Sequence, residues 1–431
     1  MSLTDVGPVN VVAEERCEKM TGNIRRSLRK LPAAIAVALL AAGAVSPAIA
    51  GDHAYKILYS FQNQAAGGYP YASLISDKAG NLYGTTFGGG GNACEFGCGT
   101  VFKLTPDGTE TVLHTFTGGS DGSLPRGSLI MDKAGNLYGT TESGGSGGGD
   151  CGCGTVFKLA PDGTETILYS FKAGNDGYSP FGGVIADKAG NLYGTTLEGG
   201  NGGGSGIVFK LAPDGTETVL HAFSGTDGSS PFAGLIADKA GNLYGTTSGG
   251  GSGDVECGCG VVFKVAPNGA ETVLYSFKSF DDGRTPFGGL MADKAGNLYG
   301  TTTVGGSGTA CSIGCGTVFK LAPDGTETIL YAFKGGKDGA EPYGGVIEKS
   351  DSLYGTTTYG GDIGCDEGFG CGTVFRIASG GVEKVLHAFP SGTQDGYGPY
   401  ASLLAGKAGT LYGAAYSGGS GQLGTVFELK K

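Results

Sequence analysis

Ten of the 11 cysteines occur in closely spaced pairs, and paired thiols form disulfides or bind zinc. The pairs are Cys94 and Cys98, Cys151 and Cys153, Cys257 and Cys259, Cys311 and Cys315, and Cys365 and Cys371. In an exported protein this pairwise spacing favours disulfides that each close a short loop. The two Cys-x-Cys pairs would close a small, strained ring, so pairing between neighbouring segments is the alternative there. Zinc is a second alternative, although the cysteine-bearing segments contain no histidine.

A second set of candidate residues consists of six aspartates, each followed by glycine at the same position of a repeated segment. They are Asp121, Asp176, Asp227, Asp282, Asp338 and Asp395. Arranged around a channel, their carboxylates would surround one mouth and attract a cation. The alternative is that Asp and Gly simply form the turn, because Asp accepts backbone N–H bonds and Gly adopts positive φ. The Asp-x-Asp-x-Asp spacing of a calcium loop is absent, so no metal is predicted.

A third set is aromatic and could stack on sugar rings or other flat apolar surfaces. Its members share one position of the repeat, and they are Tyr71, Phe181, Phe232, Phe287, Tyr343 and Tyr400. The remaining copy has Arg126 at this position. Six aromatic copies also suit a purely structural packing role, which makes Arg126 the exception most worth testing.

The histidines give little support for catalysis. His114, His221 and His387 occupy a position where other copies have tyrosine, namely Tyr59, Tyr169, Tyr275 and Tyr331. This interchange favours amphipathic positions on an outer strand rather than metal ligands or general bases. No Ser-His-Asp order, His-Glu-x-x-His, Gly-x-Ser-x-Gly or phosphate loop is present. We therefore predict no catalytic residue and no cofactor.

These candidates are positioned by a repeat that occurs seven times and contains Leu-Tyr-Gly. Its tyrosines are Tyr83, Tyr138, Tyr193, Tyr244, Tyr299, Tyr354 and Tyr412, which are 55, 55, 51, 55, 55 and 58 residues apart. A period of this size is typical of propellers and solenoids. Each of the first six copies contains four short runs of β-branched and aromatic residues separated by turn sequences such as Asp-Lys-Ala-Gly-Asn and Pro-Asp-Gly, which predicts a four-stranded antiparallel sheet.

The two ends of the chain decide between a propeller and a solenoid. The last copy ends at Leu429 with three strands, and one extra fourth strand, Tyr55–Phe61, stands alone near the start. A closed ring explains this split, because the first strand completes the last sheet. We predict a seven-bladed β-propeller of four-stranded antiparallel blades, with a β-solenoid as the alternative. All long, variable loops then lie on one face, where binding residues usually occur.

Residues 1–50 differ from the repeat and resemble a cleavable secretory signal. Basic residues at 25–30 precede the apolar run Leu31–Val45, which ends near Ala48-Ile49-Ala50. A membrane anchor is the alternative, but the apolar run is short for a span. Met20 is a second possible start. The expected domains are therefore an N-terminal extension with its signal, 1–50, and one propeller domain, 51–431.

The charge of the chain restricts its partners. Residues 51–431 carry 23 basic and 36 acidic side chains, a formal charge of −13, without a basic stripe. Nucleic acid is therefore not an expected partner. No second hydrophobic span follows the signal, and we expect a secreted or periplasmic monomer without a membrane span in its mature form.

The combination of Asp-Lys-Ala-Gly-Asn-Leu-Tyr-Gly-Thr-Thr with Gly-Thr-Val-Phe-Lys-Leu-x-Pro-Asp-Gly closely resembles the GloVer tandem repeats of bacterial proteins. The resemblance extends from Tyr55 to Leu429 and implies an exported bacterial propeller, but no established activity. Many such proteins carry C-terminal anchors, whereas only two lysines follow Leu429 here, so free secretion or a periplasmic location is expected.

The sequence is compatible with two functions. The first is a non-catalytic binding or scaffold propeller that engages a glycan, a peptide or a protein through its long-loop face. The alternative is a lyase or glycan-acting hydrolase with carboxylates at the channel mouth, because propellers host both kinds of function.

Overall fold

The computed structural model describes residues 54–91, 93–147, 152–200, 204–251, 258–278, 281–361, 365, 369–390 and 394–430. The expected signal, 1–50, lies outside the described residues, as do Cys151 and Cys257. Within the described part, no helix is long and apolar enough to cross a membrane.

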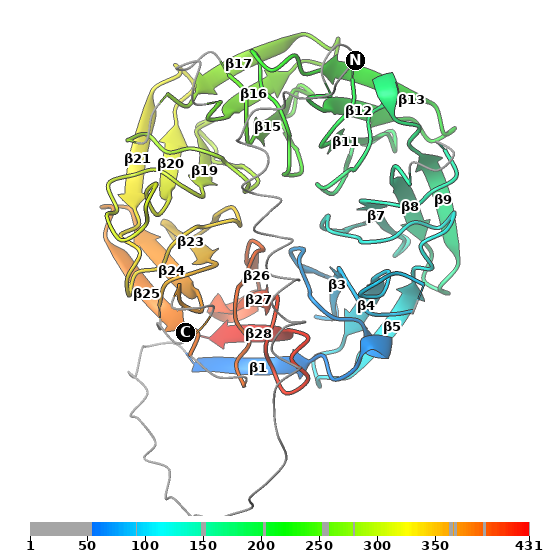
Figure 1. Cartoon of the computed structure of the whole chain (residues 1–431), viewed down its shortest axis with the longest axis horizontal. Helices are drawn as coiled ribbons and strands as arrows, with labels where there is room; N and C mark the ends of the chain where they lie inside the picture. Colours follow the sequence, from blue (N-terminus) through cyan, green and yellow to red (C-terminus); the bar gives the residue numbers. More distant parts are fainter. Residues whose placement is uncertain are drawn as a thin grey trace, which may run out of the picture. The chain divides into compact units, whose positions relative to one another are not determined.

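Residues 54–430 form seven four-stranded antiparallel sheets arranged as blades around a central axis (Figure 1). The strands of each blade are given from the axis outward. Blade 1 contains β2 (Ile75–Ser76), β3 (Leu82–Thr86), β4 (Thr100–Leu104) and β5 (Glu110–Thr115), and blade 2 contains β6 (Ile130–Met131), β7 (Leu137–Thr141), β8 (Thr155–Leu159) and β9 (Glu165–Ser170). Blade 3 contains β10 (Ile185–Ala186), β11 (Leu192–Thr196), β12 (Ile207–Leu211) and β13 (Glu217–Ala222), and blade 4 contains β14 (Ile236–Ala237), β15 (Leu243–Thr247), β16 (Val261–Val265) and β17 (Glu271–Ser276).

Blade 5 contains β18 (Met291–Ala292), β19 (Leu298–Thr302), β20 (Thr317–Leu321) and β21 (Glu327–Ala332); blade 6, β22 (Ile347–Lys349), β23 (Ser352–Thr357), β24 (Thr373–Ala378) and β25 (Glu383–Ala388); and blade 7, β26 (Leu404–Ala405), β27 (Leu411–Ala415), β28 (Thr425–Lys430) and β1 (Ala54–Ser60). Short 3-10 turns lie at Gln64–Ala66, Gly174–Asp176 and Lys407–Gly409. The seven-bladed β-propeller predicted from the repeat is confirmed.

Blade 7 combines the two ends of the propeller. Strand β1 pairs antiparallel with β28, with Ala54 opposite Lys430 and Ser60 opposite Thr425. Every other blade is built from consecutive strands. The outer strand of blade 7 therefore comes from the N-terminal side of the ring and its three inner strands from the C-terminal side.

The Leu-Tyr-Gly part of the repeat has a structural role at each residue. In blade 1 the Leu82 side chain is buried, and Tyr83 donates a hydrogen bond of 3.1 Å to Asp77 in the preceding turn. At Gly84 an added Cβ would lie 2.8 Å from Cζ of Phe102 and 2.9 Å from Cδ2 of Leu74. Only glycine therefore leaves room for the core aromatic of the next strand.

The Thr-Thr pair that follows connects each blade to its surroundings. In blade 2, Thr140 donates a hydrogen bond of 3.0 Å to the carbonyl of Gly182 in blade 3. Its neighbour Thr141 donates to the Ser143 carbonyl at 2.9 Å and contacts the Thr155 hydroxyl at 2.8 Å. The strongest repeated motif is thus explained by architecture and does not mark a functional site.

The hydrophobic core lies between the blades. A fully buried phenylalanine after each outer strand packs on a fully buried phenylalanine in the third strand of the next blade, with ring centroids 5.0 to 5.5 Å apart. The pairs are Phe61–Phe102, Phe116–Phe157, Phe171–Phe209, Phe223–Phe263, Phe277–Phe319, Phe333–Phe375 and Phe389–Phe427. Edge-to-face pairs of this kind stabilise both blades they join.

Long loops from neighbouring blades bond to each other on one face. The residue before each loop proline donates its N–H to the loop between the second and third strands of the previous blade, as Leu124 does to the Cys98 carbonyl at 2.8 Å. Leu124 has φ 58°, and five other non-glycine residues at this position also have positive φ. At five of the seven junctions the acceptor is the carbonyl of a cysteine: Cys98, Cys153, Cys259, Cys315 or Cys371.

Candidate functional site

The aromatic residues predicted from the repeat meet around the axis, on the face of the long loops. We define the aromatic collar as Tyr71, Arg126, Phe181, Phe232, Phe287, Tyr343 and Tyr400. Successive ring centroids are 4.9 Å apart for Phe181–Phe232, 4.5 Å for Phe232–Phe287, 5.2 Å for Phe287–Tyr343, 5.1 Å for Tyr343–Tyr400 and 5.0 Å for Tyr400–Tyr71. The seven positions therefore form one continuous ring of contacts.

Arg126 fills the one gap in this ring. Its guanidinium carbon lies 5.2 Å from the ring centre of Tyr71, 4.6 Å from that of Phe181 and 4.1 Å from that of Phe87. Its Nε donates to Oε2 of Glu142 at 2.5 Å, and its side chain is only 12% exposed. Cation–π contacts thus replace the aromatic contacts of the other copies. The exception singled out in the sequence is therefore a collar member with a carboxylate partner.

The collar has two chemically different sides. Phe181, Phe232 and Phe287 make one side apolar. The other side contains Tyr343, Tyr400 and Tyr71, with Tyr416 added at 5.3 Å from Tyr400. Burial raises the pKa of Tyr400 well above its usual value of 10, and the surrounding tyrosines raise it further. This phenol is therefore protonated at neutral pH and retains its hydrogen-bond donor.

A cavity of about 300 Å³ lies within the collar and continues along the innermost strands. The channel wall beyond the collar consists largely of small residues such as Gly182 and Gly183. A Cβ on Gly183 would lie 2.1 Å from the Ser128 carbonyl oxygen, so glycine permits the close approach of neighbouring inner strands. Among the described residues that line the cavity, Arg126 is the sole charged side chain.

The six Asp-Gly aspartates lie elsewhere, and the expectation that they surround the channel mouth does not hold. Asp176 accepts a hydrogen bond from the backbone N–H of Lys172 at 2.6 Å and another from the Tyr169 hydroxyl on outer strand β9. Equivalent contacts to the outer strand or its following loop are made by Asp121, Asp227, Asp282, Asp338 and Asp395. These aspartates have the turn geometry typical of Asp-Gly, at the outer rim of the propeller.

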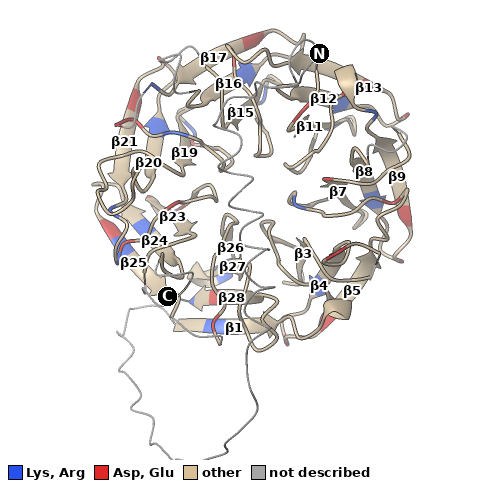
Figure 2. Cartoon of the chain, in the orientation of Figure 1, with Lys and Arg blue, Asp and Glu red and all other residues tan. Residues whose placement is uncertain are grey.

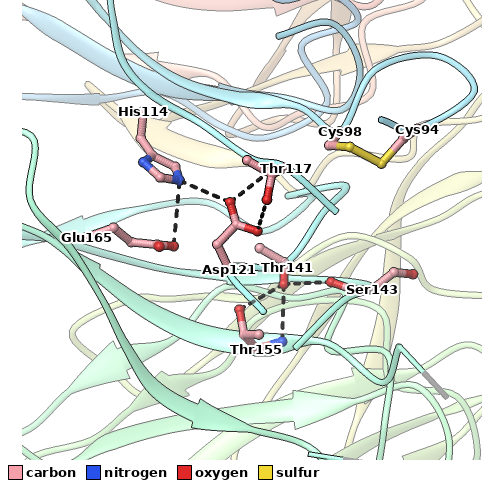
Figure 3. A network of polar contacts seen from close by, with 9 residues as sticks. All are labelled: Cys94, Cys98, His114, Thr117, Asp121, Thr141, Ser143, Thr155 and Glu165. Atoms are coloured by element: carbon pink, nitrogen blue, oxygen red, sulfur yellow. Dashed lines mark hydrogen bonds and ion pairs between the residues drawn. A yellow bond between two sulfur atoms is a disulfide. The ribbon is translucent and has the colours of Figure 1, made fainter. Parts of the chain in front are cut away.

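A glutamate from the next blade joins each of five aspartates. Glu165, the first residue of β9, lies 3.7 Å from Nε2 of His114, which in turn lies 3.8 Å from Asp121 (Figure 3). Burial, and then the neighbouring aspartate, raises the pKa of these glutamates to about 7; they are Glu165, Glu217, Glu271, Glu327 and Glu383. Figure 2 shows acidic positions on the outer strands.

The local disulfides expected from the sequence are confirmed for three pairs: Cys94–Cys98, Cys311–Cys315 and Cys365–Cys371. Cys153 and Cys259 are also disulfide-bonded, while the other members of the two Cys-x-Cys pairs lie outside the described residues. A Cβ on Gly118 would lie 2.8 Å from Sγ of Cys94. The first disulfide therefore packs directly on the loop that carries Asp121.

Sequence reasoning missed three parts of these sites: Glu142 beside Arg126, Tyr416 beside the collar, and the outer-strand glutamates. A signal for each was present. Glu142 and Tyr416 directly follow the Thr-Thr position, where the copies differ, and a glutamate recurs four residues before each outer-strand histidine or tyrosine in blades 1 to 6. Their convergence depends on contacts between blades, which the order of residues within one copy does not show.

Seven four-stranded blades with long loops gathered over an aromatic channel mouth define a repeat-built β-propeller. The chain belongs to the Gloeobacter/Verrucomicrobia repeat family, which matches residues 42–256, 146–365 and 307–431. This confirms the resemblance read from the repeat motif. A comparison with the sequences of curated proteins finds no relative.

Several solved structures are similar to this chain at low identity. A gluconolactonase from Xanthomonas campestris is 18% identical, with 64% of this chain and 78% of that chain covered and a TM-score of 0.38. A putative glucose dehydrogenase from Thermus thermophilus is 14% identical, with 88% and 99% covered and a TM-score of 0.42. PorZ, a surface component of the type-IX secretion system of Porphyromonas gingivalis, is 14% identical, with 85% and 46% covered and a TM-score of 0.49. Because each TM-score is below 0.5, none of their activities is transferred to this chain.

Proposed function

We propose that the protein is a non-catalytic binding propeller that acts outside the cytoplasm and receives a carbohydrate at its aromatic collar. The observation that carries this proposal is the continuous ring of six aromatic side chains, in which Arg126 replaces the seventh. A purely structural ring has no need for this exception, because six other copies pack with an aromatic residue. The exception introduces a cation and its partner Glu142 at the mouth of the cavity.

The chemistry of the collar suits a sugar ring. The phenylalanine side offers apolar surface to the C–H face of a pyranose, while phenol groups and the Arg126–Glu142 pair offer hydrogen bonds to its hydroxyls. Small-molecule sites typically combine such an apolar lining with a few polar groups. The disulfide-braced loops around the mouth provide the rigid frame that such a site requires.

The location outside the cytoplasm rests on the disulfides and on the predicted signal. Disulfides persist in oxidising compartments, and three are present in the described residues alone. Detection of the mature N-terminus near Gly51 by sequencing the protein from a culture medium or a periplasmic extract would support export. Recovery of an unprocessed chain in the cytoplasm would contradict it.

The binding proposal is tested by titrating the purified protein with a panel of neutral and acidic oligosaccharides, using calorimetry and ligand-observed NMR. The variant Arg126→Phe restores the residue type of the other copies, so it is expected to fold normally and to bind at least tenfold more weakly. Lys188→Ala, in an exposed turn on the opposite face, is the matched control and should bind like the parent. The absence of binding to every sugar, or equal binding by Arg126→Phe, would refute the proposal.

The alternative, a lyase or glycan-acting hydrolase, is examined with the same panel. No aspartate or glutamate is among the described residues that line the cavity, and Glu142 is held by Arg126. Turnover of a bound sugar that disappears in Glu142→Gln would replace the binding proposal with the enzymatic one. Binding without product formation over many hours would favour the binding propeller.

A further inference from the structure

Two junctions between blades bring a histidine, an aspartate and a glutamate together at the outer rim. We call these the rim clusters: the first consists of His114, Asp121 and Glu165, and the second of His221, Asp227 and Glu271. In each cluster, one ligand atom from every residue lies within 4.8 Å of the others. Figure 3 shows the first cluster. Its side chains are 18%, 16% and 12% exposed, so they are largely but not fully shielded from solvent.

The spacing in the first rim cluster approaches that of a metal site. Nε2 of His114 lies 3.8 Å from Oδ2 of Asp121 and 3.7 Å from Oε1 of Glu165. Ligand atoms at zinc distances of 2.0 to 2.2 Å in a tetrahedron are about 3.4 Å from one another. The two histidine–carboxylate distances are therefore within a few tenths of an ångström of this value, and the two carboxylate oxygens lie within 4.8 Å of each other. Nε2 of His114 and Oε1 of Glu165 are buried and make no hydrogen bond, so a metal ion would give both atoms a partner. In the second rim cluster, Nε2 of His221 already contacts Oδ2 of Asp227 at 3.0 Å.

Other junctions of the same chain show what this position looks like when it is purely structural. There a tyrosine replaces the histidine and donates its hydroxyl hydrogen to the aspartate, as Tyr275 does to Asp282 at 2.8 Å. A lysine follows the buried phenylalanine, and Nζ of Lys278 lies 5.6 Å from the centre of the Tyr275 ring. Tyr169 with Lys172, and Tyr331 with Lys334, repeat this combination.

The histidine junctions lack this lysine. Thr117 and Ser224 occupy the lysine position next to the first and second rim clusters. Two carboxyl groups therefore face each other beside an imidazole with no lysine at the position that supplies one in the tyrosine junctions. Three of the tyrosine junctions carry this lysine, whereas Gln62 occupies the position next to Tyr59 and Pro390 the position next to His387. At the two rim clusters, a hydroxyl residue and a metal-ligating histidine therefore stand where those three junctions have lysine and tyrosine.

The hydroxyl residues also hold the aspartates in place. Thr117 donates to Asp121 from its backbone N–H at 2.8 Å and from its hydroxyl at 2.6 Å. Ser224 donates to Asp227 from the equivalent groups at 2.7 and 2.9 Å. Hydrogen bonds of this kind orient carboxylates that bind metals. In the first rim cluster, the Cys94–Cys98 disulfide additionally packs against the loop between Thr117 and Asp121.

The third histidine junction lacks the glutamate, because β1 supplies its outer strand. Tyr55 takes the place of that residue and stacks on His387, with ring centroids 3.8 Å apart and planes at 1°. Its hydroxyl donates to the Asp395 carbonyl at 2.8 Å. This junction offers one carboxylate instead of two, and its imidazole is covered by an aromatic ring.

We propose that each rim cluster binds one divalent transition-metal ion of the zinc type, with histidine nitrogen and two carboxylate oxygens as protein ligands and water completing the coordination. Imidazole among the ligands favours such ions over calcium and magnesium. Each ion would connect the outer strand of one blade to that of the next. The sites are therefore structural clamps between blades 1 and 2 and between blades 3 and 4. This proposal replaces the interpretation of His114 and His221 as simple substitutes for tyrosine.

The test uses the chain from residue 51 onward, stripped with a chelator and then titrated with Zn²⁺ by calorimetry, with metal content measured after dialysis. The expected stoichiometry is two ions per chain, together with a rise in Tm on zinc addition. The double variant His114→Tyr/His221→Tyr adopts the residue of the sibling junctions and should fold, bind no zinc and show no zinc-dependent rise in Tm. His387→Tyr is the matched control and should still bind two ions.

A gain-of-site variant makes the test independent of any loss of stability. Tyr169→His/Lys172→Thr converts a tyrosine junction into the histidine type, and the stoichiometry should rise from two to three. Failure of the parent chain to bind zinc would overturn the proposal, as would unchanged binding in the double histidine variant. Equal binding of Ca²⁺ that survives the histidine substitutions would also overturn it, because the carboxylates alone would then hold the ion.

Discussion

The glutamates at the tyrosine junctions make the stability of the ring depend on pH. Burial, and then the adjacent aspartates, raises the pKa of Glu217, Glu327 and Glu383 from 4.5 to about 7. Between pH 4.5 and 7 the folded chain therefore binds more protons at these positions than the unfolded chain does. The stabilisation is complete near pH 4.5 and is lost as the pH rises through 7.

The magnitude follows from the size of the shift. In the absence of solvent screening, this rise in pKa would contribute about 3 kcal/mol per glutamate to the free energy of unfolding. Because the carboxyl groups keep contact with solvent, screening reduces this to about 1 kcal/mol each. Three groups then contribute about 3 kcal/mol, which lowers the Tm of a domain of this length by about 5 °C between pH 5 and 8.

The assay is differential scanning calorimetry at several pH values in the presence of a chelator. The triple variant Glu217→Gln/Glu327→Gln/Glu383→Gln carries the neutral side chain at every pH, so its Tm should fall by several degrees less over the same range. Asp107→Asn is the matched control, because this aspartate is exposed in a turn. Hydrogen bonds from Thr105 and Thr109 lower the pKa of Asp107, and its effect is confined to acidic pH. Equal pH slopes for the triple variant and the parent would refute the reasoning.

Three further predictions concern the blades and the loops. Phe116→Ala removes a fully buried ring that packs on Phe157 and should cost about 3 to 5 kcal/mol, measured as a fall in the urea midpoint; a loss below 1 kcal/mol would contradict the packing described. Gly84→Ala places a methyl group 2.8 Å from Phe102, so we expect the free energy of unfolding to fall by about 1 to 3 kcal/mol. Gly336→Ala is the control, because an added Cβ there meets nothing within 4 Å; it should change Tm by less than about a degree. Cys94→Ser/Cys98→Ser should lower the free energy of unfolding by about 2 kcal/mol. Peptide mapping by mass spectrometry under non-reducing conditions should show Cys153 joined to Cys151 and Cys259 joined to Cys257. Free thiols at these positions would contradict the local pairing.

The number of blades, their strand content and the position of the aromatic collar could all be predicted from the sequence, because each depends on a pattern within one copy. The spacing of Tyr83 and its equivalents defines the blade, and Tyr71 and its equivalents lie four residues before the innermost strand. These features need only the period of the repeat and the alternation of core residues.

Contacts between copies could not be predicted in the same way. The Asp-Gly aspartates allowed two interpretations, a ring of carboxylates at the channel mouth or simple turn formation, and the order of residues within one copy could not show that their loop directs them toward the outer strand. Glu165 reaches His114 only because neighbouring blades pack at a fixed distance. Likewise, nothing in the sequence distinguishes Glu142 from other loop carboxylates, and its contact with Arg126 is evident only in the folded structure.

The pairing of β1 with β28 has a consequence for the order of assembly. Ala54 and Lys430, which lie opposite each other in this sheet, are separated by almost the whole propeller in sequence. Contacts of such long range form late. During synthesis, β1 is made before all other strands of the propeller and has no partner until the last strand follows. A chain that stops before β28 leaves an open edge at both ends of an incomplete ring, where aggregation and proteolysis begin. Because β1 needs β28 as its partner, only a chain that extends to β28 can close the ring.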